Sequence, residues 1–170
     1  MKILVTYYSQ TGNTVKIAKA IQEELSTSHS VAIKTIAEAN TDDVAVYDLV
    51  LVGSPLHASD LTQPVKNFLT SKNWRAGQQM AGFITHFAPA YPEQEMDKFT
   101  ESFQSLCQKE SMEYLGAFDC QGYLENSIHG VVQEKLQCSD EQWKEIVEQM
   151  TGRPNADDVE RAKVFARNLV

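Results

Sequence analysis

Six consecutive residues near the N-terminus are all polar or glycine and could together bind an anion. They supply three hydroxyls, two side-chain amides and one glycine at which the backbone can turn tightly: Ser9, Thr11, Thr14, Gln10, Asn13 and Gly12. The segment lies between an apolar run and a helical pattern, so its N–H groups would lie at a helix N-terminus. Free N–H groups and the helix dipole favour an anion there. The residues therefore predict a site for a terminal phosphate group that needs no positively charged side chain.

Other phosphate-binding and catalytic signatures are absent from the sequence. There is no GxxxxGK[ST] segment, which excludes a P-loop NTPase, and no GxGxxG, the dinucleotide fingerprint. The polar loop contains no cysteine that could act as a phosphatase nucleophile, and no GxSxG elbow of a hydrolase is present. A phospho-accepting receiver domain is also excluded, because no acidic pair follows the first strand and the third ends in Gly53 rather than Asp.

Five short apolar segments predict strands that position this loop. The predicted strands are Lys2–Tyr8, Val31–Ile36, Asp48–Gly53, Met80–Thr85 and Leu115–Cys120. The third is predicted to stop at Gly53–Ser54–Pro55, because glycine and proline interrupt strands.

Helical periodicity fills the intervals between the strands. The predicted helices contain Val15, Ala18, Ile21 and Leu25; Val65, Phe68 and Leu69 after a cap at Thr62; Met96, Phe99, Phe103 and Leu106 after Pro92; Trp143, Ile146, Val147 and Met150 after a Ser139–Gln142 capping box; and Val159, Ala162, Ala166 and Leu169 after Asn155. Residues 121–137 are the least regular and predict a loop or lid with a short helix around Val131–Leu136.

The repeated alternation of strand and helix predicts the fold class. Five repeats indicate an α/β protein, a three-layer αβα sandwich whose parallel sheet is covered on both faces, with additional C-terminal helices. At 170 residues the chain is predicted to form a single domain, residues 1–170. In such folds ligands bind at the carboxyl ends of the strands, which is where the loop 9–14 lies.

Two motifs resemble the flavodoxin family. The segment Val5–Thr14 (VTYYSQTGNT) is similar to the family's strand followed by a phosphate loop, and Val52–Pro55 (VGSP) is similar to the start of its second flavin loop. The resemblance implies a five-stranded sheet of order 2-1-3-4-5 and one non-covalent FMN. The flavin would lie at the carboxyl ends of the first, third and fourth strands.

The resemblance also implies which residues contact FMN. Ser9, Gln10, Thr11, Gly12, Asn13 and Thr14 would hold the phosphate, and two further loops would flank the isoalloxazine ring. The residues implied there are Ser54, Pro55, Leu56 and His57 in one loop, and His86, Phe87, Ala88 and Tyr91 in the other. Tyr123 and His129 would lie near the ring edge if residues 121–137 form a lid.

The net charge differs between the two halves of the sequence, and this difference indicates which partners the protein could bind. Residues 1–85 carry no net charge and residues 86–170 carry −8, which disfavours nucleic acid and anionic lipid and favours partners with basic docking surfaces. The chain shows neither a signal peptide nor an apolar run long enough for membrane insertion, so we expect a cytoplasmic protein.

Cysteine and histidine spacing suggests no further chemistry. The three widely spaced cysteines fit neither a disulfide framework nor a zinc site, and Cys120 is predicted to be a buried structural residue. The four histidines lack the spacing of metal ligands, so no metal is expected.

These observations favour an FMN-binding electron-transfer protein that exchanges electrons with redox partner proteins and needs no acid–base residue. Two alternatives stay open. One is an NAD(P)H-dependent FMN reductase acting on a quinone or similar acceptor, with His57, His86 or Tyr91 donating a proton. The other is a flavodoxin-like fold without flavin that acts as a binding module.

Overall fold

A β-sheet with helices on both faces forms the centre of the computed structural model, which describes residues 1–39, 44–57, 60–87 and 93–170, with the backbone alone for 93–97. The strands are β1 (Lys2–Tyr7), β2 (Ser30–Thr35), β3 (Leu49–His57), β4 (Asp60–Leu61), β5 (Gln79–His86) and β6 (Glu113–Gln121). Their order is β2-β1-β3-β5-β6, all parallel, and β4 pairs antiparallel with the end of β3. The predicted order 2-1-3-4-5 of the five parallel strands is therefore confirmed.

The predicted end of the third strand is wrong, because β3 continues through Ser54 and Pro55 to His57. Gly53 O accepts a hydrogen bond from Tyr8 N on the β1 side, at 3.0 Å. Two residues later Pro55 faces that same side, beyond the end of β1, so its missing N–H has no partner to lose. On the other side β3 stays paired with β5 as far as Pro55 and Thr85.

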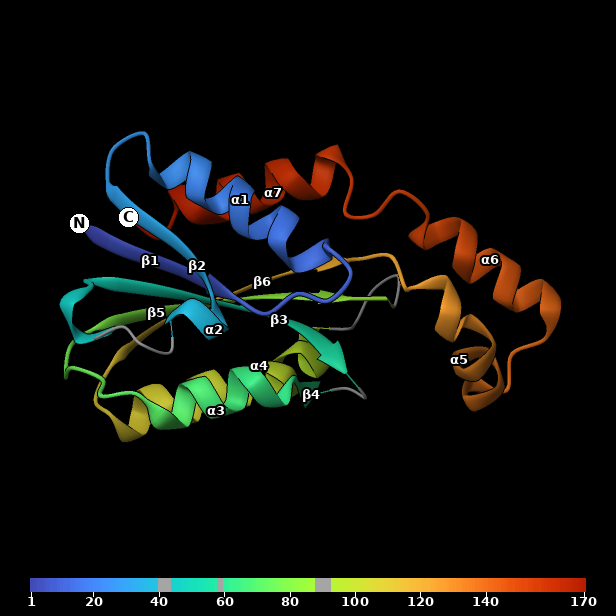
Figure 1. Cartoon of the computed structure of the whole chain (residues 1–170), viewed down its shortest axis with the longest axis horizontal. Coiled ribbons are helices and arrows are strands. Elements are labelled where there is room, and N and C mark those ends of the chain that lie inside the picture. The colour runs from blue at the N-terminus through green and yellow to red at the C-terminus, as the bar shows by residue number, and fades with distance from the viewer. Residues whose placement is uncertain (40–43, 58–59, 88–92) are drawn as a thin grey trace.

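Helices cover both faces of the sheet (Figure 1). They are α1 (Asn13–Leu25), α2 (Ile36–Ala39), α3 (Gln63–Ser71), α4 (Glu93–Lys109), α5 (His129–Leu136), α6 (Asp140–Met150) and α7 (Ala156–Arg167), with 3₁₀ turns η1 (Val44–Val46) and η2 (Asn126–Ile128). Helices α1 and α7 lie on one face and α3 and α4 on the other, which gives the three predicted layers. None of the helices in the described part of the chain combines the length and apolar character needed to cross a bilayer.

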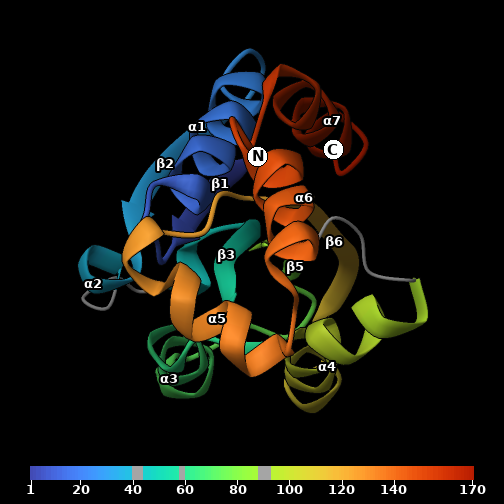
Figure 2. The ribbon, with the colours of Figure 1, turned by 90° about the vertical axis from the view of Figure 1, so that its right-hand side faces the viewer.

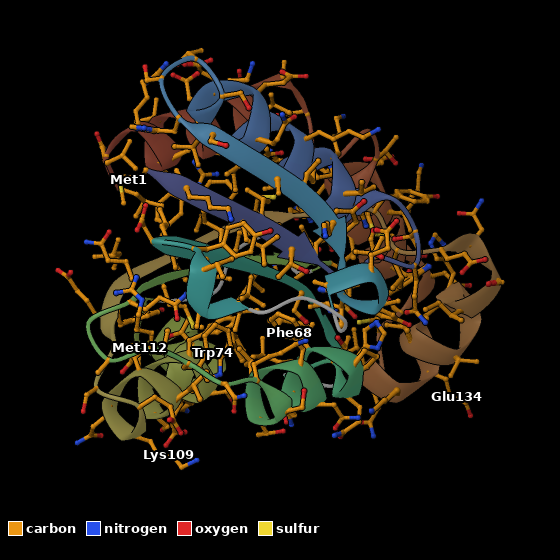
Figure 3. All side chains as sticks on the ribbon, turned by 60° about the vertical axis from the view of Figure 1, so that its left-hand side comes forward. Met1, Phe68, Trp74, Lys109, Met112 and Glu134 are labelled. Atoms are coloured by element: carbon orange, nitrogen blue, oxygen red, sulfur yellow. The ribbon has the colours of Figure 1, made fainter. Side chains whose placement is uncertain are left out.

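Each face of the sheet has its own apolar core. Phe68, Met80 and Phe103 are fully buried between the sheet and the α3–α4 layer. Trp74 meets Phe68 edge-on there, with ring centroids 6.0 Å apart, and both lie below the sheet in Figure 3. On the opposite face Ile17 and Phe83 pack between the sheet and α1 and α7. Strand residues buried on both sides explain the uninterrupted apolar runs in the sequence.

Helix α7 is fixed by a buried carboxylate at its start. Asp158 is 1% exposed, accepts a hydrogen bond from the Asn155 backbone N–H at 2.9 Å, and pairs with Arg153 at 2.6 Å. The side chain of Asn155 accepts from the N–H groups of Asp157 and Asp158, which completes the helix cap. The Lys16 ammonium donates to the carbonyl of Pro154 and ties the same turn to α1. The cap predicted at Asn155 is confirmed, and so is the Ser139–Gln142 capping box of α6.

The Asp158→Ala substitution should destabilise the protein, because it removes half of the cap and leaves the Arg153 guanidinium without its partner. We expect a loss of about 2–4 kcal/mol in the free energy of unfolding, measured by urea denaturation. The matched control is Asp157→Ala, one residue earlier and exposed, which should cost less than about 1 kcal/mol. Equal losses for the two variants would contradict a special role for the buried carboxylate.

Candidate functional site

The loop between β1 and α1 presents an uncapped helix N-terminus at the carboxyl edge of the sheet. Gly12 takes the N-cap position with φ of 91°, a conformation that side chains disfavour, and no added Cβ would meet another atom within 4 Å. Within the described residues no side chain caps α1, and its first turn carries no acidic residue. The N–H groups of that turn are therefore available to an anion.

The hydroxyl of Ser9 gives independent evidence for a polar ligand at this loop. Its Oγ is buried and has no hydrogen-bond partner among the described residues. A buried polar atom without a partner costs free energy, so such atoms are rare in native proteins. A ligand oxygen beside the loop would satisfy it.

The remaining side chains of the loop are held from two directions. Thr14 is buried, and its hydroxyl lies 2.9 Å from that of Thr85 at the end of β5. The Asn13 amide donates to Thr11 Oγ1 at 3.1 Å and to the carbonyl of Tyr123, beyond β6, at 2.8 Å. The loop is thus fixed to the ends of two strands before any ligand binds.

A cavity of about 120 Å³ opens beside this loop at the carboxyl ends of the strands. Three segments of the chain far apart in sequence surround it, together with the polar loop. Its lining residues are Gln10, Thr11, Asn13, Thr14, Pro55, Leu56, His57, Thr85, His86, Phe87, Gly122, Tyr123, Leu124, Glu125 and Ile128. Nine of the fourteen residues predicted to contact a cofactor are in this set. Ser9 and Gly12 belong to the loop but are not among the lining residues, and Ala88 and Tyr91 lie outside the described residues.

The predicted residue Ser54 has an internal role in the structure. It is fully buried, accepts a hydrogen bond from the Thr62 N–H at 3.1 Å, and donates to the carbonyl of Pro55 at 2.8 Å. Its hydroxyl therefore holds the end of β3 against the start of α3. This contact positions Leu56 and His57.

The two predicted histidines of the site differ in their surroundings. His57 is exposed at the end of β3, where it pairs with Asp60 of β4. The His86 ring is 2% exposed, and its Nε2 lies 3.0 Å from Asp119 Oδ2 on the neighbouring strand β6. His57 can therefore contact a ligand at the open side of the cavity, whereas His86 is fixed as part of its wall.

The wall beyond His86 is reinforced by two further hydrogen bonds from the end of β6. The Gln121 side-chain amide donates to the carbonyl of Phe87 at 2.9 Å, and the Gly122 N–H donates to the carbonyl of His86 at 2.7 Å. These bonds fix the start of the loop that follows β5.

The sequence singled out only part of the segment that follows β6. It predicted Tyr123 near the ligand, and Leu124, Glu125 and Ile128 also line the cavity although no motif marked them. The strand topology could have indicated these residues, because the fifth parallel strand must also end at the carboxyl edge of the sheet, beside the polar loop. The short helix predicted around Val131–Leu136 is present as α5, which begins slightly earlier, at His129.

An aromatic cluster holds this segment together next to the cavity. The Tyr123 and His129 rings have centroids 5.8 Å apart, and the His129 and Trp143 rings 5.4 Å apart in an edge-on contact. His129 Nε2 also lies 2.9 Å from the carbonyl of Leu124. Contacts from Tyr123 through His129 thereby connect the cavity wall to α6.

Cys120 is buried at the end of β6, as predicted for a structural residue. Burial raises the pKa of its thiol well above the usual value, and the nearby carboxylates of Asp158 and Asp119 raise it further. Burial also raises the pKa of Cys107, to about 11. Neither thiol forms the thiolate needed for nucleophilic chemistry near neutral pH.

The Gly122→Ala substitution tests the contact between the polar loop and the segment after β6. A Cβ at this position would lie 2.6 Å from Asn13 Nδ2, so the Asn13 side chain would have to move and lose its bond to Tyr123. We expect a loss of about 1–3 kcal/mol in the free energy of unfolding, measured by urea denaturation.

The matched control is Gly130→Ala in α5, where nothing lies within 4 Å of the added Cβ. Alanine is the better helix former, so this variant should be unchanged or more stable by up to about 1 kcal/mol. If Gly122→Ala were as stable as the control, the close contact between Gly122 and Asn13 would not limit the side chain at position 122.

Comparison with known proteins places this site in a family. Residues 4–167 match the family described as flavodoxin domain. An uncharacterised protein of Methanocaldococcus jannaschii is 27% identical over 171 residues, covering 100% of this chain and 99% of that protein. Oxidised flavodoxin 2 from Bacillus cereus has a similar structure, with a TM-score of 0.67, 21% identity, and coverage of 98% of this chain and 96% of that one.

A flavoprotein in complex with FMN from Lactobacillus acidophilus has a TM-score of 0.52 and 23% identity, covering 69% of this chain and 92% of that one. The family match spans nearly the whole chain and includes the polar loop, the ends of β3 and β5, and the segment after β6. The chain therefore belongs to the flavodoxin domain family.

Proposed function

We propose that this protein binds FMN and transfers electrons between redox partner proteins. The observation that carries the proposal is the combination of an uncapped α1 N-terminus with a buried, unpartnered Ser9 hydroxyl beside it. Both features would be satisfied by one terminal phosphate. The fold similarity to a flavoprotein in complex with FMN supports the choice of ligand.

Different residues of the site would contact the phosphate and the isoalloxazine ring of FMN. The hydroxyls and N–H groups of Ser9–Thr14 would hold the phosphate, with no cationic side chain required. Pro55, Leu56 and His57 on one side, and His86 and Phe87 on the other, would flank the ring. Bound FMN would supply the capacity to accept and release electrons.

The site is small for such a ligand. Its volume of about 120 Å³ is below the range of roughly 300–1,000 Å³ common for pockets that enclose a small molecule. FMN would fill the cavity and extend past its mouth, which would leave part of the ring open to solvent. An exposed ring edge is what direct electron exchange with another protein requires.

The proposal also covers the cellular compartment and the partner proteins. Its three cysteines are all free, which fits a reducing compartment such as the cytoplasm. The net charge of −8 fits redox partners with basic docking surfaces.

A paired titration with FMN and riboflavin tests the phosphate assignment. The Ser9→Ala, Thr11→Val double variant removes two hydroxyls from the loop without touching the ring-flanking residues. We expect its FMN affinity to fall about 100- to 10,000-fold, because two hydrogen bonds to a charged group are lost and each contributes about 1.5–3 kcal/mol. Riboflavin lacks the phosphate, so its affinity should change less than about threefold. Quenching of flavin fluorescence measures both constants.

The Ser26→Ala, Thr27→Val double variant is the matched control, with the same chemistry at the opposite end of α1. It should bind FMN like the unmodified protein. Equal losses for FMN and riboflavin in the loop variant would contradict phosphate binding there, and a protein that takes up no flavin would favour the alternative of a flavin-free binding module.

Steady-state kinetics separates electron transfer from the reductase alternative. We expect the FMN-loaded protein to oxidise NADPH with a simple quinone at less than about 1 s⁻¹, below typical enzyme turnover, which lies near 10 s⁻¹. Absorbance at the NADPH band measures this rate without any partner protein. Turnover in the usual enzymatic range that falls on His57→Ala substitution would instead support the reductase.

A further inference from the structure

The segment that contains η2, α5 and α6, residues 126–150, projects beyond the carboxyl ends of the strands. We call it the arm. In Figure 1 it lies outside the three layers, at the end of the molecule opposite both termini. In Figure 2, which views the molecule from that end, α5 and α6 lie in front of the sheet.

One face of the arm is apolar and uncovered. None of the eight residues of α5 is buried. Ile128, Val131 and Leu136 are 42%, 67% and 46% exposed. Ile128 ends η2, and Val131, Val132 and Leu136 follow in α5, so these aliphatic residues lie close together in the arm. Three large aliphatic side chains exposed within one short segment are typical of an interaction surface rather than of a solvated one.

This apolar face is continuous with the candidate flavin site. Ile128 and Glu125 line the cavity, and α5 follows directly after them. A protein that packs on Ile128, Val131 and Leu136 would therefore also border the mouth of the cavity. The aromatic contact from His129 to Trp143 holds α6 beside the same surface.

Negative charge surrounds the apolar face. The arm contains five carboxylates and two lysines, a net charge of −3, and Glu125 adds a sixth carboxylate immediately before it. The carboxylates are all on exposed residues: Glu125, Glu134, Asp140, Glu141, Glu145 and Glu148. Glu134 lies at the outer edge of α5, far from Met1 (Figure 3). The arm thus combines an apolar centre with an acidic rim.

We propose that the arm is the docking surface for a redox partner protein that has an apolar patch surrounded by lysine and arginine. The inference rests on the proposed electron-transfer function and specifies where the partner binds. Charge complementarity selects the occupant, since opposite potentials favour association and like charges oppose it. A second copy of this chain would bring two acidic arms together, and an anionic membrane would be repelled in the same way.

Binding measurements with cytochrome c, a basic haem protein, test this location without depending on electron transfer. Isotope-labelled protein, with and without FMN, is titrated with cytochrome c at about 10 mM ionic strength, where the Debye length is about 30 Å. We expect amide shift changes concentrated in residues 125–148, and an affinity that falls at least tenfold when the ionic strength reaches about 0.15 M.

Two pairs of variants separate the apolar centre from the acidic rim. Val131→Ser with Leu136→Ser should weaken cytochrome c binding about three- to tenfold, and Glu134→Lys with Glu141→Lys about tenfold or more. Matched controls are Val46→Ser with Val164→Ser, which are 49% and 42% exposed elsewhere, and Glu101→Lys with Glu113→Lys, both exposed outside the arm. Each control should change the affinity less than twofold.

Several results would overturn the proposal. Shift changes centred outside the arm, or equal effects of arm variants and controls, would place the docking surface elsewhere. Sedimentation of the protein as a dimer that dissociates on Val131→Ser with Leu136→Ser substitution would assign the face to a second copy. An altered FMN affinity in that variant would assign it to flavin binding. Flavin uptake is measured separately. A colourless protein that takes up no flavin would contradict the proposed function, whereas the shift changes, dimer dissociation or altered FMN affinity described above would contradict the docking site.

Discussion

The uncapped N-terminus of α1 is the constraint on which the rest of the site depends. Helices α6 and α7 satisfy part of their first N–H groups with the side chains of Ser139 and Asn155, whereas α3 has no side-chain cap hydrogen bond. Helix α1 begins at a glycine with positive φ instead, and the nearby Ser9 hydroxyl is also without a partner among the described residues. The protein thus keeps several donors free at one point, an arrangement suited to a ligand that supplies acceptors.

The parallel sheet keeps that point rigid. Thr14 reaches Thr85 on β5, and Asn13 reaches the backbone beyond β6, so the ends of two strands hold the loop in place. Gly122 makes the last of these contacts possible, since any side chain there would overlap Asn13. A preorganised loop loses little conformational entropy on binding, which raises the affinity that a few hydrogen bonds can give.

The same contacts connect the loop to the arm. From Asn13 the path runs through Tyr123 and His129 to Trp143, all by direct hydrogen bond or ring contact. The arm therefore has a fixed position beside the cavity, although α5 buries none of its residues. This explains how a segment with little core of its own can present apolar and acidic side chains in a defined geometry at the site.

The sequence alone determined the loop and the layers, because hydroxyls before a helix and strand–helix alternation are local patterns that tertiary contacts did not override. The strand order was implied by the resemblance of two motifs to the flavodoxin family, not by a local pattern. Local patterns also located the caps at Ser139 and Asn155. Only the tertiary structure decided that β3 continues through Pro55, since that depends on where β1 ends. It also gave Ser54 an internal role and brought Asp119 to His86 and Gly122 to Asn13. The contacts of His86 with Asp119 and of Gly122 with Asn13 join residues more than thirty positions apart, and no periodicity in the sequence specifies them.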